Sequence, residues 1–443
     1  QTRLGNYSWS DDFVGNAFLE FTPIEELTFR TSVGGKLATW GGDFFTPVYF
    51  LSSTVQATQN SLSRNLNKGF GWNVENTLSY TDNVGLHNFT VLVGQGTYVD
   101  NITSGTNITY QDLPIDSYKD ASFNFNISPD KIAGSSYTGN EHRVISLFSR
   151  LNYNYNEKYL FTGIIRRDGS TNFGPNKKFG IFPSFSAGWV VSEENFLRDS
   201  ETLNTLKLRA GYGVTGNDAI PPFGYLSLIG GGRNYTLGRE GQIIWTGNSP
   251  DAPANPDLQW EETAQLNVGF DARLFQNITL TLEYYEKVTE GILQRVTLPG
   301  YVGATGEPLG NVADMENRGI ELELGYNRTF GDFSFSANGN VSRLHNEVTY
   351  LGQGKEFISS GASFQSMGNI TRTQVGEAMN SFYGFRHDGI FQTPEEVQSY
   401  TSADGAVIQP NAVPGDFKWV DTDGDGSITD DDKQFIGSPI PKY

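Results

Sequence analysis

Residues 421–432, DTDGDGSITDDD, place acidic side chains at the alternating positions that a calcium loop requires. Asp421, Asp423 and Asp425 stand at positions 1, 3 and 5, and Gly426 stands at position 6, where the chain must turn sharply. Calcium takes six to eight oxygen ligands, and this spacing turns alternate carboxylates towards one point. The stretch therefore predicts a calcium site, with an acidic solvated turn as the alternative.

The second half of the loop completes the predicted ligand set. Ser427 at position 7 would supply its carbonyl, Thr429 at position 9 would reach the ion through water, and Asp432 at position 12 would close the site. The preceding VPGDFKWV contains Pro and Gly and reads as extended chain, so the loop lacks the incoming helix of an EF-hand. We therefore expect a weak structural site, with a dissociation constant of about 10⁻⁴–10⁻³ M.

No other motif indicates catalysis, and we predict that the protein is not an enzyme. GYGVTG, from Gly211 to Gly216, has dinucleotide-binding spacing, but the two prolines in NDAIPPFG forbid the helix that would hold a pyrophosphate. The 4 histidines are far apart in the sequence, and there is no cysteine, which excludes a thiol nucleophile. A net charge of −19 argues against a nucleic-acid partner, because phosphate binding needs a basic surface.

Aromatic residues in predicted long loops are the candidates for substrate contact. Rings among Gly and Asn residues could bind sugar faces or peptides, although loops packing on each other would use the same residues. The candidates are Trp40, Tyr235, Trp245, Tyr301, Phe382 and Tyr383.

The elements that carry these loops are predicted to be long β-strands. Apolar and polar residues alternate through 263–274 (TAQLNVGFDARL) and again through 278–285, on either side of a tight FQN turn. The pattern recurs, and we predict about twelve strands, most of about 9–13 residues, a length that crosses a membrane when tilted. Tyr and Phe near strand ends, as in YNYNEKYLF, are typical of the aromatic girdles of membrane barrels.

Short and long connections alternate along the chain, which indicates an antiparallel barrel with turns at one end and loops at the other. The short turns are predicted near 23–26, 81–86, 156–158, 275–277 and 328–332, with a somewhat longer one at 192–204. The long loops are predicted at about 36–68, 97–142, 215–259, 288–316 and 347–441. A soluble β-sandwich or jelly roll also alternates, but its strands would be shorter.

Four stretches resemble the SusC/RagA-like TonB-dependent transporters. They are RRDGSTNFGPNKKFGIFPSFSAGWVVSEENFL (166–197), LKLRAGYGVTGND (206–218), NPDLQWEETAQLNVGFD (255–271) and GNVADMENRGIELELGY (310–326). The end of the chain, from VGEAMNSFYGFRHDGIFQTPEE onward, is similar to a long loop that these proteins carry late in the barrel.

The resemblance implies part of a 22-stranded antiparallel transmembrane β-barrel, with short periplasmic turns and long extracellular loops. Residues 1–346 would form barrel strands with their loops, and 347–443 a long extracellular loop with the calcium motif. The plug domain and the final strands would lie outside this chain. The implied location is the outer membrane of Bacteroidota-type bacteria, in contact with its lipid.

The implied function is TonB-dependent import of oligosaccharides or peptides. The implied partners are a SusD-like lipoprotein that covers the extracellular loops, and TonB on the periplasmic side. The rival hypothesis, from another class, is a soluble or surface calcium-dependent glycan-binding or adhesion β-protein.

Overall fold

The computed structural model describes residues 6–53, 55–237, 243–296, 298–304, 306–352, 356–358 and 368–441. The chain forms two compact units. Unit 1 comprises Gln1–Phe185, Asn217–Trp260 and Leu298–Pro308, and unit 2 comprises Ser186–Gly216, Glu261–Thr297 and Leu309–Tyr443. Among the described residues, no helix is long and apolar enough to cross a membrane.

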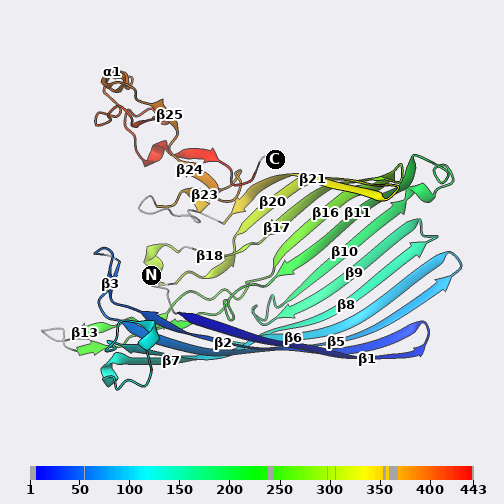
Figure 1. Cartoon of the computed structure of the whole chain (residues 1–443), viewed down its shortest axis with the longest axis horizontal. Coiled ribbons are helices and arrows are strands. Elements are labelled where there is room, and N and C mark those ends of the chain that lie inside the picture. The colour runs from blue at the N-terminus through cyan, green and yellow to red at the C-terminus, as the bar shows by residue number, and fades with distance from the viewer. Residues whose placement is uncertain are drawn as a thin grey trace. The chain divides into compact units, whose positions relative to one another are not determined.

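Unit 1 is an antiparallel meander in which the long strands pair in the order β1-β2-β5-β6-β8-β9-β10, with β7 also paired to β6 (Figure 1). These strands are β1 (Tyr7–Ile24), β2 (Leu27–Thr46), β5 (Ser61–Val84), β6 (His87–Gln111), β7 (Ile132–Thr138), β8 (His142–Tyr155), β9 (Tyr159–Ser170) and β10 (Phe179–Val190), the last of which belongs to unit 1 up to Phe185. Small hairpins occupy its long connections: β3 (Tyr49–Phe50) with β4 (Gln56–Ala57), β12 (Ile229–Gly230) with β15 (Ser249–Pro250), and β13 (Tyr235–Leu237) with β14 (Ile243–Trp245).

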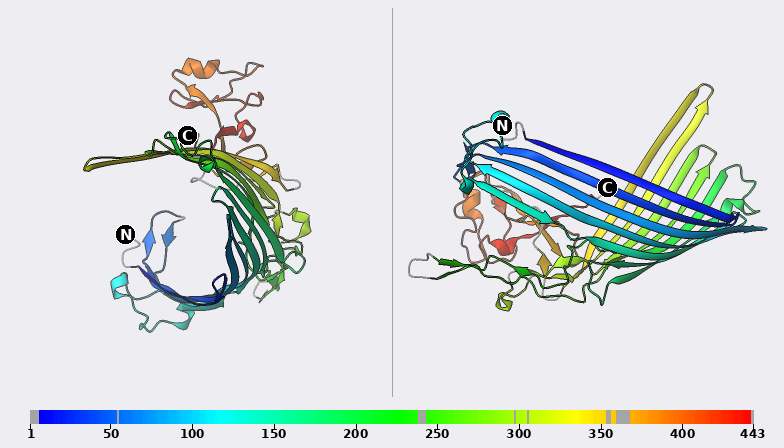
Figure 2. Two further views of the ribbon diagram at one scale, coloured as in Figure 1. Left: turned by 90° about the vertical axis from the view of Figure 1, so that its right-hand side faces the viewer. Right: turned by 90° about the horizontal axis from the view of Figure 1, so that it is seen from below.

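Unit 2 continues the same plan, with long strands in the order β11-β16-β17-β20-β21 (Figure 2). They are β11 (Leu203–Asn217), β16 (Glu261–Leu274), β17 (Ile278–Glu290), β20 (Ala313–Phe330) and β21 (Phe333–Leu351). The shorter elements are β18 (Leu293–Arg295), β19 (Leu309–Asn311), β22 (Phe357–Ile358), β23 (Thr371–Gln374), β24 (Ser381–Gly384), β25 (His387–Ile390), α1 (Pro394–Ser399), β26 (Phe417–Trp419) and β27 (Gln434–Gly437).

The sheet of unit 1 has one apolar and one polar face. Phe13, Leu37 and Phe70 stand opposite one another on β1, β2 and β5, and all three are exposed. The alternate residues carry charge, and Lys36 Nζ lies 3.4 Å from Asp12 Oδ2. Strands alternate strictly, so a face that is apolar and still exposed indicates a non-aqueous environment on that side.

The sheet of unit 2 repeats this division. Val268, Tyr284 and Ile320 are register neighbours on β16, β17 and β20, and each is exposed. The opposite face carries an ion pair, in which Arg209 Nε lies 3.3 Å from Asp271 Oδ2.

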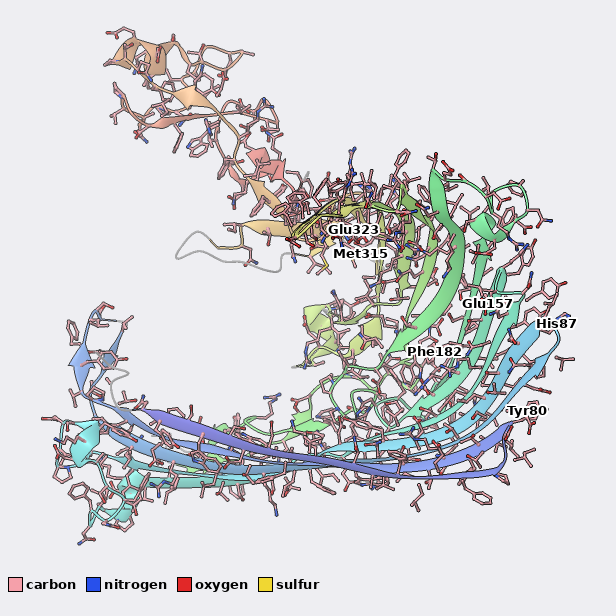
Figure 3. The ribbon with its side chains drawn as sticks, turned by 45° about the vertical axis from the view of Figure 1, so that its right-hand side comes forward. Tyr80, His87, Glu157, Phe182, Met315 and Glu323 are labelled. Carbon is pink, nitrogen blue, oxygen red and sulfur yellow. The ribbon has the colours of Figure 1, made fainter. Side chains whose placement is uncertain are left out.

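The predicted short turns are confirmed. The strand pairs β1/β2, β5/β6, β8/β9, β16/β17 and β20/β21 are joined at 24–27, 84–87, 155–159, 274–278 and 330–333. In unit 1, Tyr80, His87 and Glu157 lie together at this end of the sheet (Figure 3). The Tyr155 and Tyr159 rings stack there with centroids 6.2 Å apart, as an aromatic girdle would.

Two of the predicted long loops are wrong over much of their length. In place of a loop at 36–68, β2 runs to Thr46 and β5 begins at Ser61, and in place of one at 97–142, β6 runs to Gln111 and β7 covers Ile132–Thr138. The strands are correspondingly longer than predicted: β5 has 24 residues and β6 has 25. Both faces of these extensions carry polar residues, so the ladder continues without the alternation that marks a half-buried strand.

The other three long connections are present as predicted: 218–260 between β11 and β16, the segment between β17 and β20, and the segment after β21. Within them, residues 238–242, 297, 305, 353–355 and 359–367 lie outside the described part. Small apolar clusters pack at the long-loop ends of the strands. One contains Phe45, Leu62 and Leu113 in unit 1, and another contains Ala313, Val348 and Leu351 in unit 2.

Candidate calcium loop and binding surfaces

Three carboxylates of the predicted calcium loop converge in unit 2. Asp421, Asp423 and Asp432 each place a carboxylate oxygen so that the three oxygens lie within 4.8 Å of one another. Residues ten or so positions apart in sequence meet because the chain between them turns back on itself. Hard oxygen donors at this spacing suit Ca²⁺.

The closing residue, Asp432, is fully buried. Its Oδ1 accepts a hydrogen bond from the Thr422 amide at 2.6 Å, and its Oδ2 accepts one from the Thr429 amide at 2.7 Å. Thr429 caps the short 3₁₀ turn Asp430–Asp432 in a reciprocal capping box. Asp432 is therefore held in place by the backbone on both sides of the loop.

Two glycines give the loop its curvature. Gly424 and Gly426 have φ of 76° and 87°, values that residues with a Cβ rarely adopt. Their amides donate to Asp421 Oδ1 at 2.8 Å and Oδ2 at 2.9 Å. The turn thus orients the first carboxylate, as the glycine at position 6 predicts.

The other predicted ligands stand outside this carboxylate cluster. Asp425 Oδ1 accepts a hydrogen bond from the Ser427 amide at 2.7 Å, and the Thr429 hydroxyl accepts one from the Asp431 amide at 3.2 Å. Among the described residues, the acidic cluster consists of Asp421, Asp423 and Asp432.

The cluster changes the proton affinities of its members. The amide of Asp425 lowers the pKa of Asp423, but burial and the charges of Asp425, Asp432 and Asp421 outweigh it, so this pKa is raised. Burial acts to raise the pKa of Asp432, and the hydrogen bonds from the Thr429, Thr422 and Asp423 amides overcome it, so this pKa is lowered. Repulsion around Asp423 is what a cation would relieve.

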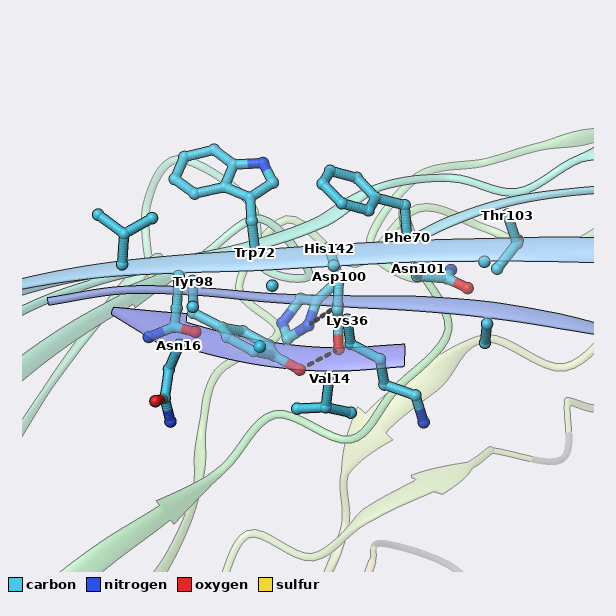
Figure 4. A pocket seen from close by; sticks show the side chains of 18 of the residues that line it. Val14, Asn16, Lys36, Phe70, Trp72, Tyr98, Asp100, Asn101, Thr103 and His142 are labelled. Carbon is cyan, nitrogen blue, oxygen red and sulfur yellow. Dashed lines mark hydrogen bonds and ion pairs between the residues drawn. The ribbon is translucent and has the colours of Figure 1, made fainter. Parts of the chain in front are cut away.

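The second candidate surface is a cavity of about 980 Å³ in unit 1, which includes Trp40 in its lining. Trp40 lies in β2 and not in a loop, which corrects the predicted location. Its ring rests over Gly69, where an added Cβ would come within 3.2 Å of it. Tyr98 and Lys36 also line this cavity from β6 and β2 (Figure 4).

His142 lines this cavity and lies between two carboxylates. Its Nδ1 lies 3.0 Å from Asp100 Oδ1, and its Nε2 lies 2.7 Å from Asp218 Oδ2. Tyr98 donates a hydrogen bond to Asp100 Oδ2 at 3.1 Å. Sequence reasoning missed this group, because Asp218 joins it from a connection far along the chain.

Three predicted aromatics are strongly exposed in unit 1. Tyr235 and Trp245 are paired across the β13/β14 hairpin and are 67% and 61% exposed. Tyr301, in the 3₁₀ turn Gly300–Val302, is 90% exposed. Such rings are free to meet a ligand or a partner.

Tyr383 and Phe382 lie in β24 of unit 2. The Arg372 guanidinium carbon lies 3.6 Å from the Tyr383 ring centroid and 3.7 Å from that of Phe357, so it is sandwiched between two rings. Tyr383 thus serves local packing, whereas Phe382 is 41% exposed.

Comparisons with known proteins identify the family of the chain. Residues 2–411 match the model of the TonB dependent receptor-like β-barrel family. The chain belongs to this family. A TonB-dependent receptor of Formosa agariphila is 32% identical over 457 residues, which cover 98% of this chain and 42% of the relative. SusC of Bacteroides thetaiotaomicron is 28% identical and covers 97% of this chain and 41% of its own length.

The structure of the RagAB peptide transporter shares the fold, with a TM-score of 0.74 and 22% identity over 98% of this chain and 45% of that one. The chain therefore spans less than half the length of the curated relatives it matches. Family membership confirms the SusC/RagA-like resemblance and the antiparallel barrel fold. It favours an outer-membrane receptor over the rival soluble adhesion protein.

Proposed function

We propose that this TonB-dependent receptor chain forms part of an importer of oligosaccharides or peptides that works with a SusD-like lipoprotein lid. SusC is named as a TonB-dependent receptor and the RagAB structure as a peptide transporter, and both are similar to this chain over nearly its whole length. TonB would supply the energy from the periplasmic side, and the long loops would be extracellular.

The observation that carries the proposal is the cavity on the polar side of unit 1. In a membrane barrel the polar face lines the lumen, where a passing ligand meets it. Trp40 and Tyr98 offer ring faces, and Asn16, Asn73 and Asn101 offer amide groups. Rings combined with a few oriented polar groups are the usual composition of a small-ligand site.

The proposal is tested by growth and uptake in the native host. Cells that lack the receptor should lose growth on one class of nutrient, oligosaccharide or peptide, and a proton uncoupler should stop uptake by complemented cells. The SusD-like protein should remain with the receptor after detergent extraction. Release of the receptor into low-salt buffer without detergent would contradict the proposal.

Replacement of Trp40 by alanine is expected to weaken ligand capture about tenfold, which corresponds to ~1.4 kcal/mol. The indole supplies a flat apolar surface over Gly69 that alanine cannot replace. Phe13→Ala is the matched control, because Phe13 lies on the opposite, apolar face and is 66% exposed. Equal uptake by Trp40→Ala and wild-type cells would remove this cavity from the proposal.

We also propose that Asp421, Asp423 and Asp432 hold a structural calcium ion. Their convergent oxygens fit the hard-donor chemistry of the ion. The bound ion would neutralise the carboxylates and brace residues 421–433 within the long connection after β21. The Asp425 side chain, directed to the Ser427 amide, would contribute less than its loop position predicts.

Calcium affinity is expected to decrease as the pH is lowered. The decrease should begin at a higher pH than it would if all ligands were ordinary aspartates. Protons compete with the ion for each ligand carboxylate. Because the pKa of Asp423 is raised, this group takes up a proton at a higher pH than an unperturbed carboxyl does. Calorimetric titration with Ca²⁺ at pH 7.5 and at about pH 4, near the pKa of an ordinary aspartate, measures the change, and an unchanged affinity would contradict ligation by Asp423.

A further inference from the structure

The cavity of unit 1 that includes Trp40 in its lining carries more carboxylates than cations around His142. The imidazole of His142 lies between Asp100 and Asp218, within hydrogen-bond distance of both. Even a protonated imidazole balances only one of these two carboxylates, so the group has a net negative charge. Figure 4 shows Tyr98, Asp100 and His142 together among the lining residues.

The other cations that line this cavity are paired with acids outside it. Lys36 Nζ lies 3.4 Å from Asp12 Oδ2, and Arg30 Nη1 lies 4.0 Å from Glu20 Oε2. Asp12 and Glu20 are not lining residues. The lysine and the arginine of the cavity therefore do not compensate the excess of negative charge around His142.

An unpaired hydrogen-bond acceptor belongs to the same lining. Asn172 is 4% exposed, and its Nδ2 donates to the carbonyls of Asp218 at 3.0 Å and Ile220 at 3.2 Å. These two bonds fix the orientation of the carboxamide, because only its NH₂ group can donate to carbonyls. Its oxygen, Oδ1, has no hydrogen-bond partner among the described residues. A buried oxygen without a donor is costly, so this atom indicates a site that a ligand donor completes.

Partial burial strengthens the attraction of this group for a cation. The side chains of His142 and Asp218 are 18% and 21% exposed, and the hydroxyl of the fully buried Ser170 lies 3.3 Å from His142 Nε2. Charges attract more strongly where water is excluded. Among the described residues, the Asp218 carboxylate has one hydrogen-bond partner, His142, so it retains acceptor sites for a ligand.

These groups suit an ammonium ion better than a metal ion or a sugar hydroxyl. Each carboxylate faces a different nitrogen of His142, so the ring has no free lone pair for a metal. An ammonium group has three N–H donors, which match carboxylate and amide oxygens. A hydroxyl also donates, but it carries no charge to balance the second carboxylate.

We propose that the part of this cavity around His142 binds a primary ammonium group of the imported ligand, such as the amino terminus of a short peptide. The ammonium donates to the Asp218 carboxylate and to Asn172 Oδ1. Asp100 adds negative charge and orients His142 against Asp218. This selectivity rests on the proposed import function, which it narrows to ligands that carry an amino group.

The test measures the affinity of the full receptor, purified in detergent, for tetra-alanine and for N-acetylated tetra-alanine. At about pH 6.5 a free α-amino group is protonated. We expect the free peptide to bind about tenfold or more tightly than the acetylated one, because a charged donor makes the stronger hydrogen bonds. Asp218→Asn should remove most of this preference, since it keeps the shape of the side chain and removes the charge.

The matched control is Asp43→Asn in the same unit. The Asp43 side chain is 28% exposed and is paired with Arg64, and it does not line the cavity. This variant should keep the wild-type preference for the free peptide. N-acetylated tetra-alanine with lysine in place of its second alanine separates two sources of the ammonium. Tight binding of this peptide would extend the site to lysine side chains, and weak binding would restrict it to amino termini.

Three outcomes would overturn the proposal. They are equal affinities of the wild type for the free and acetylated peptides, an unchanged preference in Asp218→Asn, and an equal loss of preference in Asp43→Asn. The two peptides compared on the wild type keep the test decisive if Asp218→Asn folds poorly. Uptake that a proton uncoupler stops would still support import if the ammonium preference were absent, so the two proposals fail separately.

Discussion

Replacement of Asp432 by alanine is expected to abolish calcium binding and to open residues 421–433 to protease, while the barrel stays folded. The Asp432 carboxylate is fully buried and accepts the amides of Thr422 and Thr429. Without it, two part-buried N–H groups lose their partner, at no more than about 1–3 kcal/mol each. The carboxylate cluster also loses its closing member.

The matched control for Asp432→Ala is Asp425→Ala. Its carboxylate accepts the Ser427 amide and stands outside the cluster, so this variant should retain most of the affinity for calcium. Calcium titration and timed proteolysis of the detergent-solubilised receptor measure both effects. Equal losses of calcium affinity in the two variants would indicate that Asp425 is also a ligand, as its position in the loop predicts. An unfolded barrel in either variant would show that the loop is not peripheral.

Trp260→Ala is expected to destabilise the connection at 218–260 in unit 1 by about 3–5 kcal/mol. Trp260 is 7% exposed, and its ring centroid lies 5.1 Å from that of Phe173 and 5.4 Å from that of Phe182. Its Nε1 donates to the Lys178 carbonyl at 3.1 Å. Truncation leaves a cavity and an unsatisfied carbonyl at once.

Hydrogen exchange of the full receptor measures the effect, which should appear in residues 171–178 and 218–237. The matched control is Trp245→Ala in the same connection, because Trp245 is 61% exposed and should leave exchange unchanged. Trp260→Phe should show an intermediate loss, since the ring remains and the hydrogen bond does not. Unchanged protection in Trp260→Ala would mean that the sheet alone holds this connection.

The alternation of apolar and polar residues predicts the strands and their tight turns, because a half-buried strand carries apolar residues on one face and polar residues on the other. TAQLNVGFDARL and the residues after FQN do form β16 and β17, and the turn lies at 274–278. The pattern fails in the extensions of β5 and β6 towards the long connections. There both faces carry polar residues, Leu62 packs in a small buried cluster, and backbone hydrogen bonds continue the ladder without a side-chain period.

Local spacing likewise predicts the calcium loop, because its ligands lie within twelve residues and its glycines supply the turn. The sequence alone thus determined the barrel class, the short turns and the acidic loop. Only the tertiary structure decided that Asp432 is buried and that His142 meets Asp100 and Asp218. The physical reason is that burial and cross-strand neighbours depend on the register between strands that are distant in the chain. No short stretch of sequence determines that register.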